Sequence, residues 1–213
     1  MKKILVLVAA LCIYNFSNAQ LLTFGFRAGV SSSGLQVKES FPVSGGSVSY
    51  NDGDKILGWH VGFLARASIS KLYVQPELLF VESGGNIEVT STSTSPAVLS
   101  GSEVGKITFQ SISVPVMVGL KLGKILRINA GPGFNYILSQ KVSDNLKDLD
   151  QKYKSATIGY QAGIGADLSL LMIDLKYEGG LSKLGDSVTI PGAGSFNTDM
   201  RSSQIILSVG IKL

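Results

Sequence analysis

The sequence is poor in the residues that build redox, metal and nucleophilic sites. It has one cysteine, Cys12, and one histidine, His60. Cys12 lies in an N-terminal apolar segment that we expect to be removed, so the mature chain would lack disulfides, thiolate nucleophiles and cysteine metal sites. Lipidation of Cys12 is disfavoured because Leu11 stands where a lipoprotein signal has a small residue. With no acidic cluster at ligand spacing either, we expect no metal ion and no cofactor.

Charge is also scarce. Charged residues make up 16% of the chain, and the formal net charge is +4, or about +2 once Lys2 and Lys3 are subtracted. This is too little and too scattered for the basic footprint of a nucleic-acid-binding protein, so we expect no nucleic-acid partner. The chain also has no later apolar run of helix-spanning length. If the mature protein is in a membrane, it must cross as strands.

The first residues are typical of a signal peptide. Lys2 and Lys3 are followed by an apolar segment from Ile4 to Tyr14, and Ser17-Asn18-Ala19 is a small-x-small cleavage site. A retained anchor is the alternative, but about eleven apolar residues are too few to span a bilayer. We therefore predict a cleaved signal peptide over 1–19 and a single domain over 20–213.

From Leu22 onward, the hydrophobicity alternates with a period of two residues, which indicates strands. Eight stretches show it. One face of each, counted in the third stretch from Val74 to Phe80, carries no Asp, Glu, Lys or Arg, while the other face carries charges and many glycines. Long connections after the first, third, fifth and seventh stretches alternate with short ones near 71–72, 123–125 and 169–170, which is typical of outer-membrane barrels. The predicted strands are 22–30, 57–70, 73–83, 108–122, 126–138, 157–168, 171–181 and 203–213.

Alternation alone also fits a soluble barrel whose apolar face lines a cavity. Two features favour the membrane. Glycines such as Gly119 and Gly163 on the polar face make room in a narrow lumen. Aromatic residues on the apolar face gather toward the long connections, where an interfacial girdle belongs; these are Trp59, Phe80, Tyr136, Tyr160 and Tyr177. We predict an all-β fold, an eight-stranded antiparallel up-and-down transmembrane barrel, in the bacterial outer membrane.

Four segments, in order and spacing, carry a resemblance to a known family: Tyr73–Phe80 (YVQPELLF), Ile112–Val116 (ISVPV), Ala130–Phe134 (AGPGF) and Ile173–Tyr177 (IDLKY). They resemble the PorT-like outer-membrane β-barrel family of Bacteroidetes over essentially the whole mature chain. The resemblance implies a signal peptide, an outer-membrane location and eight strands. The family's founding member is an accessory of type IX secretion, but most relatives have no assigned role.

Charged residues of the polar face predict ion pairs in the lumen, because a buried charge is tolerated only when it is paired. With a two-residue turn at Lys71-Leu72, Arg66 would face Glu77 across a hairpin. Further members of a network are expected to be Arg27, Asp174, Lys176 and Glu178. Lys121 and Arg127 would face each other, which is unfavourable unless an acid such as Asp167 or periplasmic water intervenes. The prolines inside strands, Pro76, Pro115 and Pro132, predict bulges or kinks.

His60 is predicted to be a structural lumen residue, since no Gly-x-Ser-x-Gly nucleophile motif accompanies it. The glycine-rich segment 159–165 lacks the Lys-Ser/Thr of a phosphate loop and is expected to be a strand. Residues 144–154 could form a short helix. No catalytic residue is predicted.

The sequence leaves three functions open. The first is a non-enzymatic structural or interaction module that acts through its exposed loops or periplasmic rim. Its expected partners are outer-membrane lipid and a secretion-system component or other surface protein. The second is a narrow pore for protons or ions. The third is a membrane-embedded lipid-modifying or proteolytic enzyme, for which His60 is the residue to test.

Overall fold

The computed structural model describes residues 22–36, 39–43, 46–91, 101–142, 150–153, 155–190, 194–197 and 200–213. Every regular element in these ranges is a β-strand. Among these residues, no helix is long and apolar enough to cross a membrane. The predicted signal peptide lies outside the described residues.

Eight strands form a closed antiparallel barrel, as the alternation predicts. Around the barrel the order is β4-β1-β13-β10-β9-β7-β6-β5, and β5 closes the ring by pairing with β4. The predicted fold class is confirmed. The barrel strands are β1 (Leu22–Gln36), β4 (Ile56–Ile69), β5 (Leu72–Ser91), β6 (Gly101–Leu122), β7 (Leu126–Val142), β9 (Ala156–Leu168), β10 (Leu171–Gly180) and β13 (Arg201–Lys212).

Three tight turns join barrel strands at one end of the barrel. They lie at Ser70-Lys71, at Gly123 to Ile125 and at Ser169-Leu170. Ser70 and Ser169 have φ of 57° and 55°, and Gly123 has φ of 74°. Left-handed φ values at these positions match the twist of a tight hairpin, and only glycine adopts them without steric cost.

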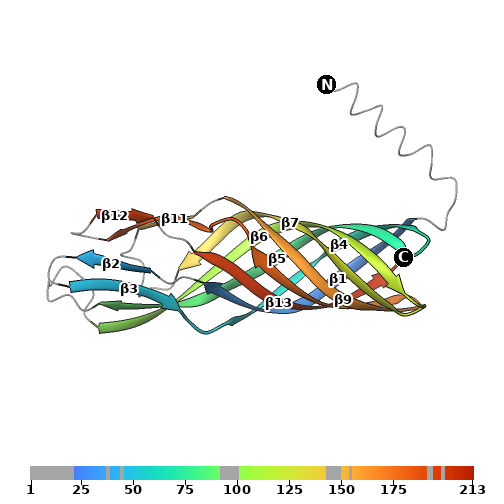
Figure 1. Ribbon diagram of the computed structural model, residues 1–213, viewed down its shortest axis with the longest axis horizontal. Helices are drawn as coiled ribbons and strands as arrows, with labels where there is room; N and C mark the ends of the chain where they lie inside the picture. The colour runs from blue at the N-terminus through green and yellow to red at the C-terminus, as the bar shows by residue number, and fades with distance from the viewer. Residues whose placement is uncertain are drawn as a thin grey trace, which may run out of the picture.

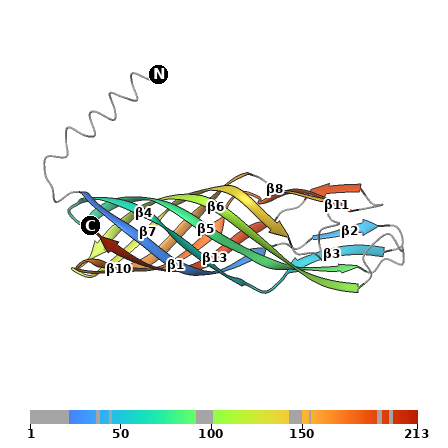
Figure 2. The ribbon, with the colours of Figure 1, turned by 180° about the vertical axis from the view of Figure 1, so that it is seen from behind.

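At the opposite end the polypeptide continues as strands beyond the closed ring. The hairpin of β2 (Glu39–Val43) and β3 (Gly46–Asp52) extends the main sheet through pairing of β3 with β5. A second, three-stranded sheet is made of β8 (Asp150–Tyr153), β11 (Gly185–Ile190) and β12 (Gly194–Asn197). Figures 1 and 2 show both groups projecting along the barrel axis, away from the tight turns. These strands, with the distal halves of β5 and β6, are here called the outer extension.

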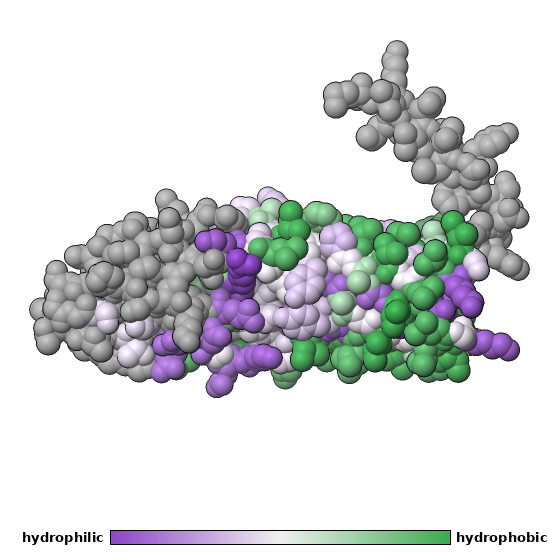
Figure 3. Space-filling model, viewed as in Figure 1, coloured by the Kyte–Doolittle hydropathy of each residue, from purple (hydrophilic) through white to green (hydrophobic). Residues whose placement is uncertain are grey.

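The apolar face of the barrel points outward. Phe26 is 48% exposed, Val61 47% and Val118 53%, although all three belong to regular strands. On the face that Figure 3 shows, most of the apolar surface lies over the barrel half of the molecule, with polar surface where the outer extension begins. A soluble barrel would bury these side chains in its cavity, so the soluble alternative is excluded.

Two local predictions are wrong. The β5–β6 register is the same on both sides of Pro76, and the β6–β7 register is the same on both sides of Pro115, so neither proline makes a bulge. Pro132 also lies in an unshifted stretch, and the shift of the β6–β7 ladder falls between Gln110 and Ser111. Of the short helix expected over 144–154, residues 150–153 form strand β8 instead, and residues 144–149 and 154 lie outside the described residues.

Candidate functional site

The inward-facing side chains of the barrel strands form a buried cluster of charges. Arg27, Arg127, Glu77, Asp174 and Lys176 are each at most 3% exposed. A charge in such a place is stabilised only by opposite charges and hydrogen bonds. We call seven ion-paired residues the lumenal network: Arg27, Arg66, Arg127, Lys176, Glu77, Asp167 and Asp174.

Asp174, on β10, is the centre of this network. Arg127 donates to both of its carboxylate oxygens, at 2.5 Å to Oδ1 and 2.7 Å to Oδ2. Arg27 donates to Oδ2 as well, and Asn129 donates to Oδ1 at 3.5 Å. Such a bidentate arginine–carboxylate pair fixes both side chains and joins β7 to β10 inside the lumen.

Glu77, on β5, forms the second centre. Its Oε1 accepts hydrogen bonds from Arg27 at 2.5 Å, from Gln75 at 2.6 Å and from Lys176 at 3.0 Å. Arg27 therefore bridges Glu77 and Asp174 across the barrel. These contacts connect β1, β5 and β10, which are not all neighbours in the sheet, so the network braces the barrel from within.

The predicted pair Arg66–Glu77 does not form. The turn lies at Ser70-Lys71 rather than Lys71-Leu72, so Ile69 pairs with Leu72 and Leu64 lies opposite Glu77. This change in register places Arg66 beside Gln75, to which it donates at 2.6 Å. Its ionic partner is Asp167, across the lumen on β9, at 2.7 Å.

Asp167 also relieves the predicted repulsion near the turn at Gly123. Lys121 does pair with Arg127 across the hairpin. Arg127 turns its Nε toward Asp167 at 2.9 Å, while Lys121 donates to Ser68 at 3.1 Å. The two cations thus have separate partners.

Glu178, the remaining predicted member, has a different environment. Its carboxylate accepts from three amides: Asn135 at 3.1 Å, Gln161 at 2.8 Å and Gln204 at 3.1 Å. In the described part of the chain it has no ion pair.

His60 points into the lumen from β4, and it is 4% exposed. Its Nε2 lies 3.0 Å from Oγ of Ser208, and no described carboxylate hydrogen-bonds to the ring. A catalytic triad needs an acid that orients the histidine and an approach for the substrate. A small cavity beside His60 has a volume of about 10 Å³, which is room for about one water molecule.

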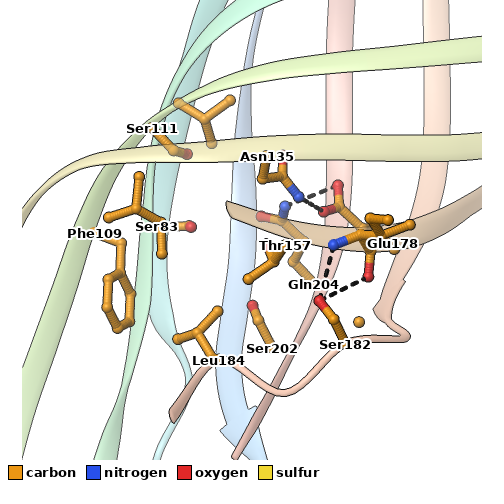
Figure 4. A pocket seen from close by; sticks show the side chains of 15 residues that line it. Ser83, Phe109, Ser111, Asn135, Thr157, Glu178, Ser182, Leu184, Ser202 and Gln204 are labelled. Carbon is orange, nitrogen blue, oxygen red and sulfur yellow. Dashed lines mark hydrogen bonds between the residues drawn. The ribbon is translucent and has the colours of Figure 1, made fainter. Parts of the chain in front are cut away.

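A larger cavity lies on the side of the outer extension, with a volume of about 40 Å³ (Figure 4). Hydroxyl and amide side chains line much of it, and Glu178 and Gln204 lie between it and the small cavity beside His60. Below both cavities the lumenal network fills the barrel. The described residues contain no group of three His, Cys, Asp or Glu side chains arranged to hold a metal ion.

Several residues of the cluster were not identified from the sequence. Tyr73 is 2% exposed, its hydroxyl accepts from Asn129 at 3.2 Å, and its ring lies 4.7 Å from the Arg66 guanidinium. Gln75 and Ser208 likewise bond to charged or titratable neighbours. The alternation already places all of them on the polar face, which is the signal that could have indicated them.

Comparison with known proteins identifies a family and several similar solved structures. A family model described as "Outer membrane protein beta-barrel domain" matches residues 17–186. No curated protein matches the chain. Solved structures similar to it include Ail, the attachment invasion locus protein of Yersinia pestis (12% identity, TM-score 0.46, covering 90% of this chain and 98% of Ail). Others are OprG of Pseudomonas aeruginosa (11%, 0.47, 91% and 94%) and Neisserial surface protein A (10%, 0.47, 89% and 97%).

The family match covers most of the chain, and the closed ring with its outward apolar band is the structure that such a domain requires. The predicted location is thereby confirmed. This chain belongs to the outer membrane protein beta-barrel domain family and is an eight-stranded barrel protein of the bacterial outer membrane.

Proposed function

We propose that this protein is a non-enzymatic interaction module, held in the outer membrane by its barrel and acting through its outer extension or its periplasmic rim. One observation carries the proposal: the lumen is filled. Arg27, Arg127 and Asp174 are each at most 1% exposed, and they meet across the barrel interior. Eight strands leave just enough space for side chains, and here those side chains are ion-paired.

The outer extension supports this function. From Leu79 onward the β5–β6 ladder continues without interruption to the pair Ser91–Gly101, and β3 adds its hairpin to β5. A paired extension costs less entropy to present to a partner than a free loop would, because its backbone is already ordered. Among the described strands, β2 has β3 as its one neighbour, so an extended segment of a partner can add to its other edge.

An enzymatic role is not part of the proposal. His60 and Ser208 do lie within hydrogen-bond distance, but both are buried and no described acid orients the histidine. The space beside them holds about one water molecule, which leaves no room for a lipid or peptide substrate.

We further propose that the chain belongs to the PorT-like branch of the family and that its partner is a secretion-system component or another surface protein. The segments Tyr73–Phe80 and Ile173–Tyr177, which carry the resemblance, supply Glu77 and Asp174, the two centres of the lumenal network. We also propose that residues 1–19 are a cleaved signal peptide and that the mature domain begins at Gln20.

Crosslinking in isolated outer membranes tests the interaction. We expect the wild-type protein to crosslink to a discrete partner. A variant in which residues 39–50 are replaced by a short Gly-Ser linker should lose this crosslink but keep the heat-modifiable gel mobility of a folded barrel. A variant with Asp167→Asn at the opposite end of the barrel serves as the control for general destabilisation, and should keep the crosslink.

The alternative function, a narrow pore, is tested by recording conductance in planar bilayers. The ion-paired lumen predicts no steady conductance steps for the wild-type protein. Reproducible steps from the wild-type protein would contradict the proposal, and so would the absence of any discrete crosslink to the wild-type protein. An unchanged crosslink in the hairpin variant would assign the contact to the periplasmic rim or to the rest of the outer extension.

A further inference from the structure

The larger cavity contains a buried carboxylate whose charge is not matched by a cation. Glu178 is 8% exposed, and its three hydrogen-bond donors are all neutral amides. Glu77, Asp167 and Asp174 share the basic groups of the lumenal network, and in the described part of the chain none of these pairs includes Glu178. A buried carboxylate in this position costs free energy unless a positive charge approaches it.

A second, independent feature lies in the same place. Gln204 is 7% exposed and lines the cavity, and its Oε1 has no hydrogen-bond partner among the described residues. Its Nε2 is committed to Glu178, so the amide orientation leaves the oxygen available. An unpaired buried acceptor is itself unfavourable, and its neighbour is an anion.

Hydroxyl groups add oxygen atoms to the rest of the lining, beside apolar side chains that include Val81, Phe109 and Leu184. The hydroxyls of Ser83, Ser111, Thr157 and Ser202 surround the space, as Figure 4 shows, while Ser182 is engaged with the backbone of Ile158. A volume of about 40 Å³ accommodates a small ion with one or two water molecules. Carboxylate, amide and hydroxyl oxygens are hard ligands, which suit hard cations.

We propose that this cavity is a binding site for one monovalent cation, sodium or potassium, held by Glu178 and by Oε1 of Gln204. A divalent ion is a poorer fit because calcium sites usually combine several carboxylates, and the described residues contain no such group. The site goes beyond the proposed interaction function and does not depend on it.

The nearby positive charges do not neutralise the site. Lys176, two residues away on β10, is bound to Glu77 at 3.0 Å and reaches Gln161 only at 3.4 Å. Two other basic groups of the lumenal network lie near Asp167, which pairs with Met172 on β10. Met172 is six residues from Glu178 on the same strand, which is about 20 Å at roughly 3.3 Å per residue. Neither Lys176 nor the basic groups around Asp167 forms an ion pair with Glu178.

Thermal unfolding of the detergent-solubilised mature protein tests the site. A cation that binds only the folded barrel raises its melting temperature. At equal ionic strength, we expect a higher, saturable melting temperature in NaCl or KCl than in N-methyl-D-glucamine chloride, whose cation is too large for the cavity. The difference between NaCl and KCl identifies the preferred ion.

The variant Glu178→Gln should lose this dependence. The matched control is Glu82→Gln, which removes a carboxylate that bonds to Gln110 outside the cavity lining and should keep the dependence. Equal melting temperatures in all three salts, or a dependence that survives in Glu178→Gln, would overturn the proposal.

Crystals of the wild-type protein soaked in rubidium chloride give a readout that does not require the variant to fold. We expect an anomalous peak between Glu178 and Gln204. Absence of a peak there would show that the cavity holds water only, and would also overturn the proposal.

Discussion

At the scale of single residues, steric fit constrains the lumenal side chains as much as charge pairing does. Tyr73 fits inside because its neighbour across the β5–β6 ladder is Gly119. A Cβ atom at position 119 would lie 2.1 Å from Cζ of Tyr73, and Tyr73 also contacts Arg66 and Asn129. The glycine is therefore required by space, not by backbone conformation.

We predict that Gly119→Ala destabilises the barrel by about 1–3 kcal/mol, the usual cost of overpacking. The measurement is the midpoint of urea unfolding in detergent. Gly133→Ala is the matched control, because its Cβ would meet only Nε2 of Gln161 at 3.9 Å, and its midpoint should shift by no more than about 0.5 kcal/mol. Equal midpoints for the two variants would show that Tyr73 is not confined as described.

The sequence predicts which residues face the lumen, but it does not predict their partners. Alternation assigns Arg27, Arg66 and Asp174 to the inner face without ambiguity. Which strand lies across the lumen depends on the stagger of the closed ring, and that is a property of all eight strands together. Arg66 therefore meets Asp167 on a distant strand, not the hairpin neighbour that local arithmetic suggested.

At the scale of elements, the position of one turn explains why the predicted pair Arg66–Glu77 does not form. Ser70 adopts a φ of 57°, which places the tight turn at Ser70-Lys71 and lets Leu72 join β5. Leu72 continues the outward series that includes Val74 and Leu78, so the alternation already contained the correct register. Strand lengths were underestimated for a different reason: beyond the apolar band, as in the distal part of β6, pairing continues among polar residues that give no alternating signal.

The aromatic residues on β4 and its neighbours mark the outer edge of the apolar band. Trp59 lies about ten residues before the end of β4, or roughly 33 Å of strand, and a tilt near 45° reduces this to roughly 23 Å of height. It is 42% exposed and packs against Phe80, with ring centroids 5.5 Å apart. This height matches the roughly 25 Å apolar band of such barrels and puts Trp59 at the interface.

Since Trp59 is the only tryptophan, its fluorescence reports this depth directly. In vesicles, we expect stronger quenching by lipids brominated close to the headgroup than by lipids brominated near the chain end. The variant Trp59→Phe defines the background signal. Stronger quenching from the bilayer centre would contradict the girdle, and no quenching by either lipid would contradict the outward placement of β4.

At the scale of the whole molecule, the two ends of the barrel differ in kind. One end has three tight turns, and the other carries the outer extension. In outer-membrane barrels, short turns face the periplasm and long connections face the outside. Asp54, two residues before β4, should therefore be outside the cell, and Lys124, in the turn after β6, should be in the periplasm; both are exposed.

The cysteine content makes this orientation measurable. Cys12 is the only cysteine, and the proposed cleavage removes it, so wild-type mature protein should not react with maleimide even when denatured. In intact cells, a membrane-impermeant maleimide should label Asp54→Cys at once and Lys124→Cys only after the outer membrane is permeabilised. The reverse pattern would invert the barrel and leave the outer extension in the periplasm, where no external partner could reach it. Labelling of the denatured wild-type protein would instead show that residues 1–19 are retained. This result would not change the orientation of the barrel, because neither Asp54 nor Lys124 lies in that segment.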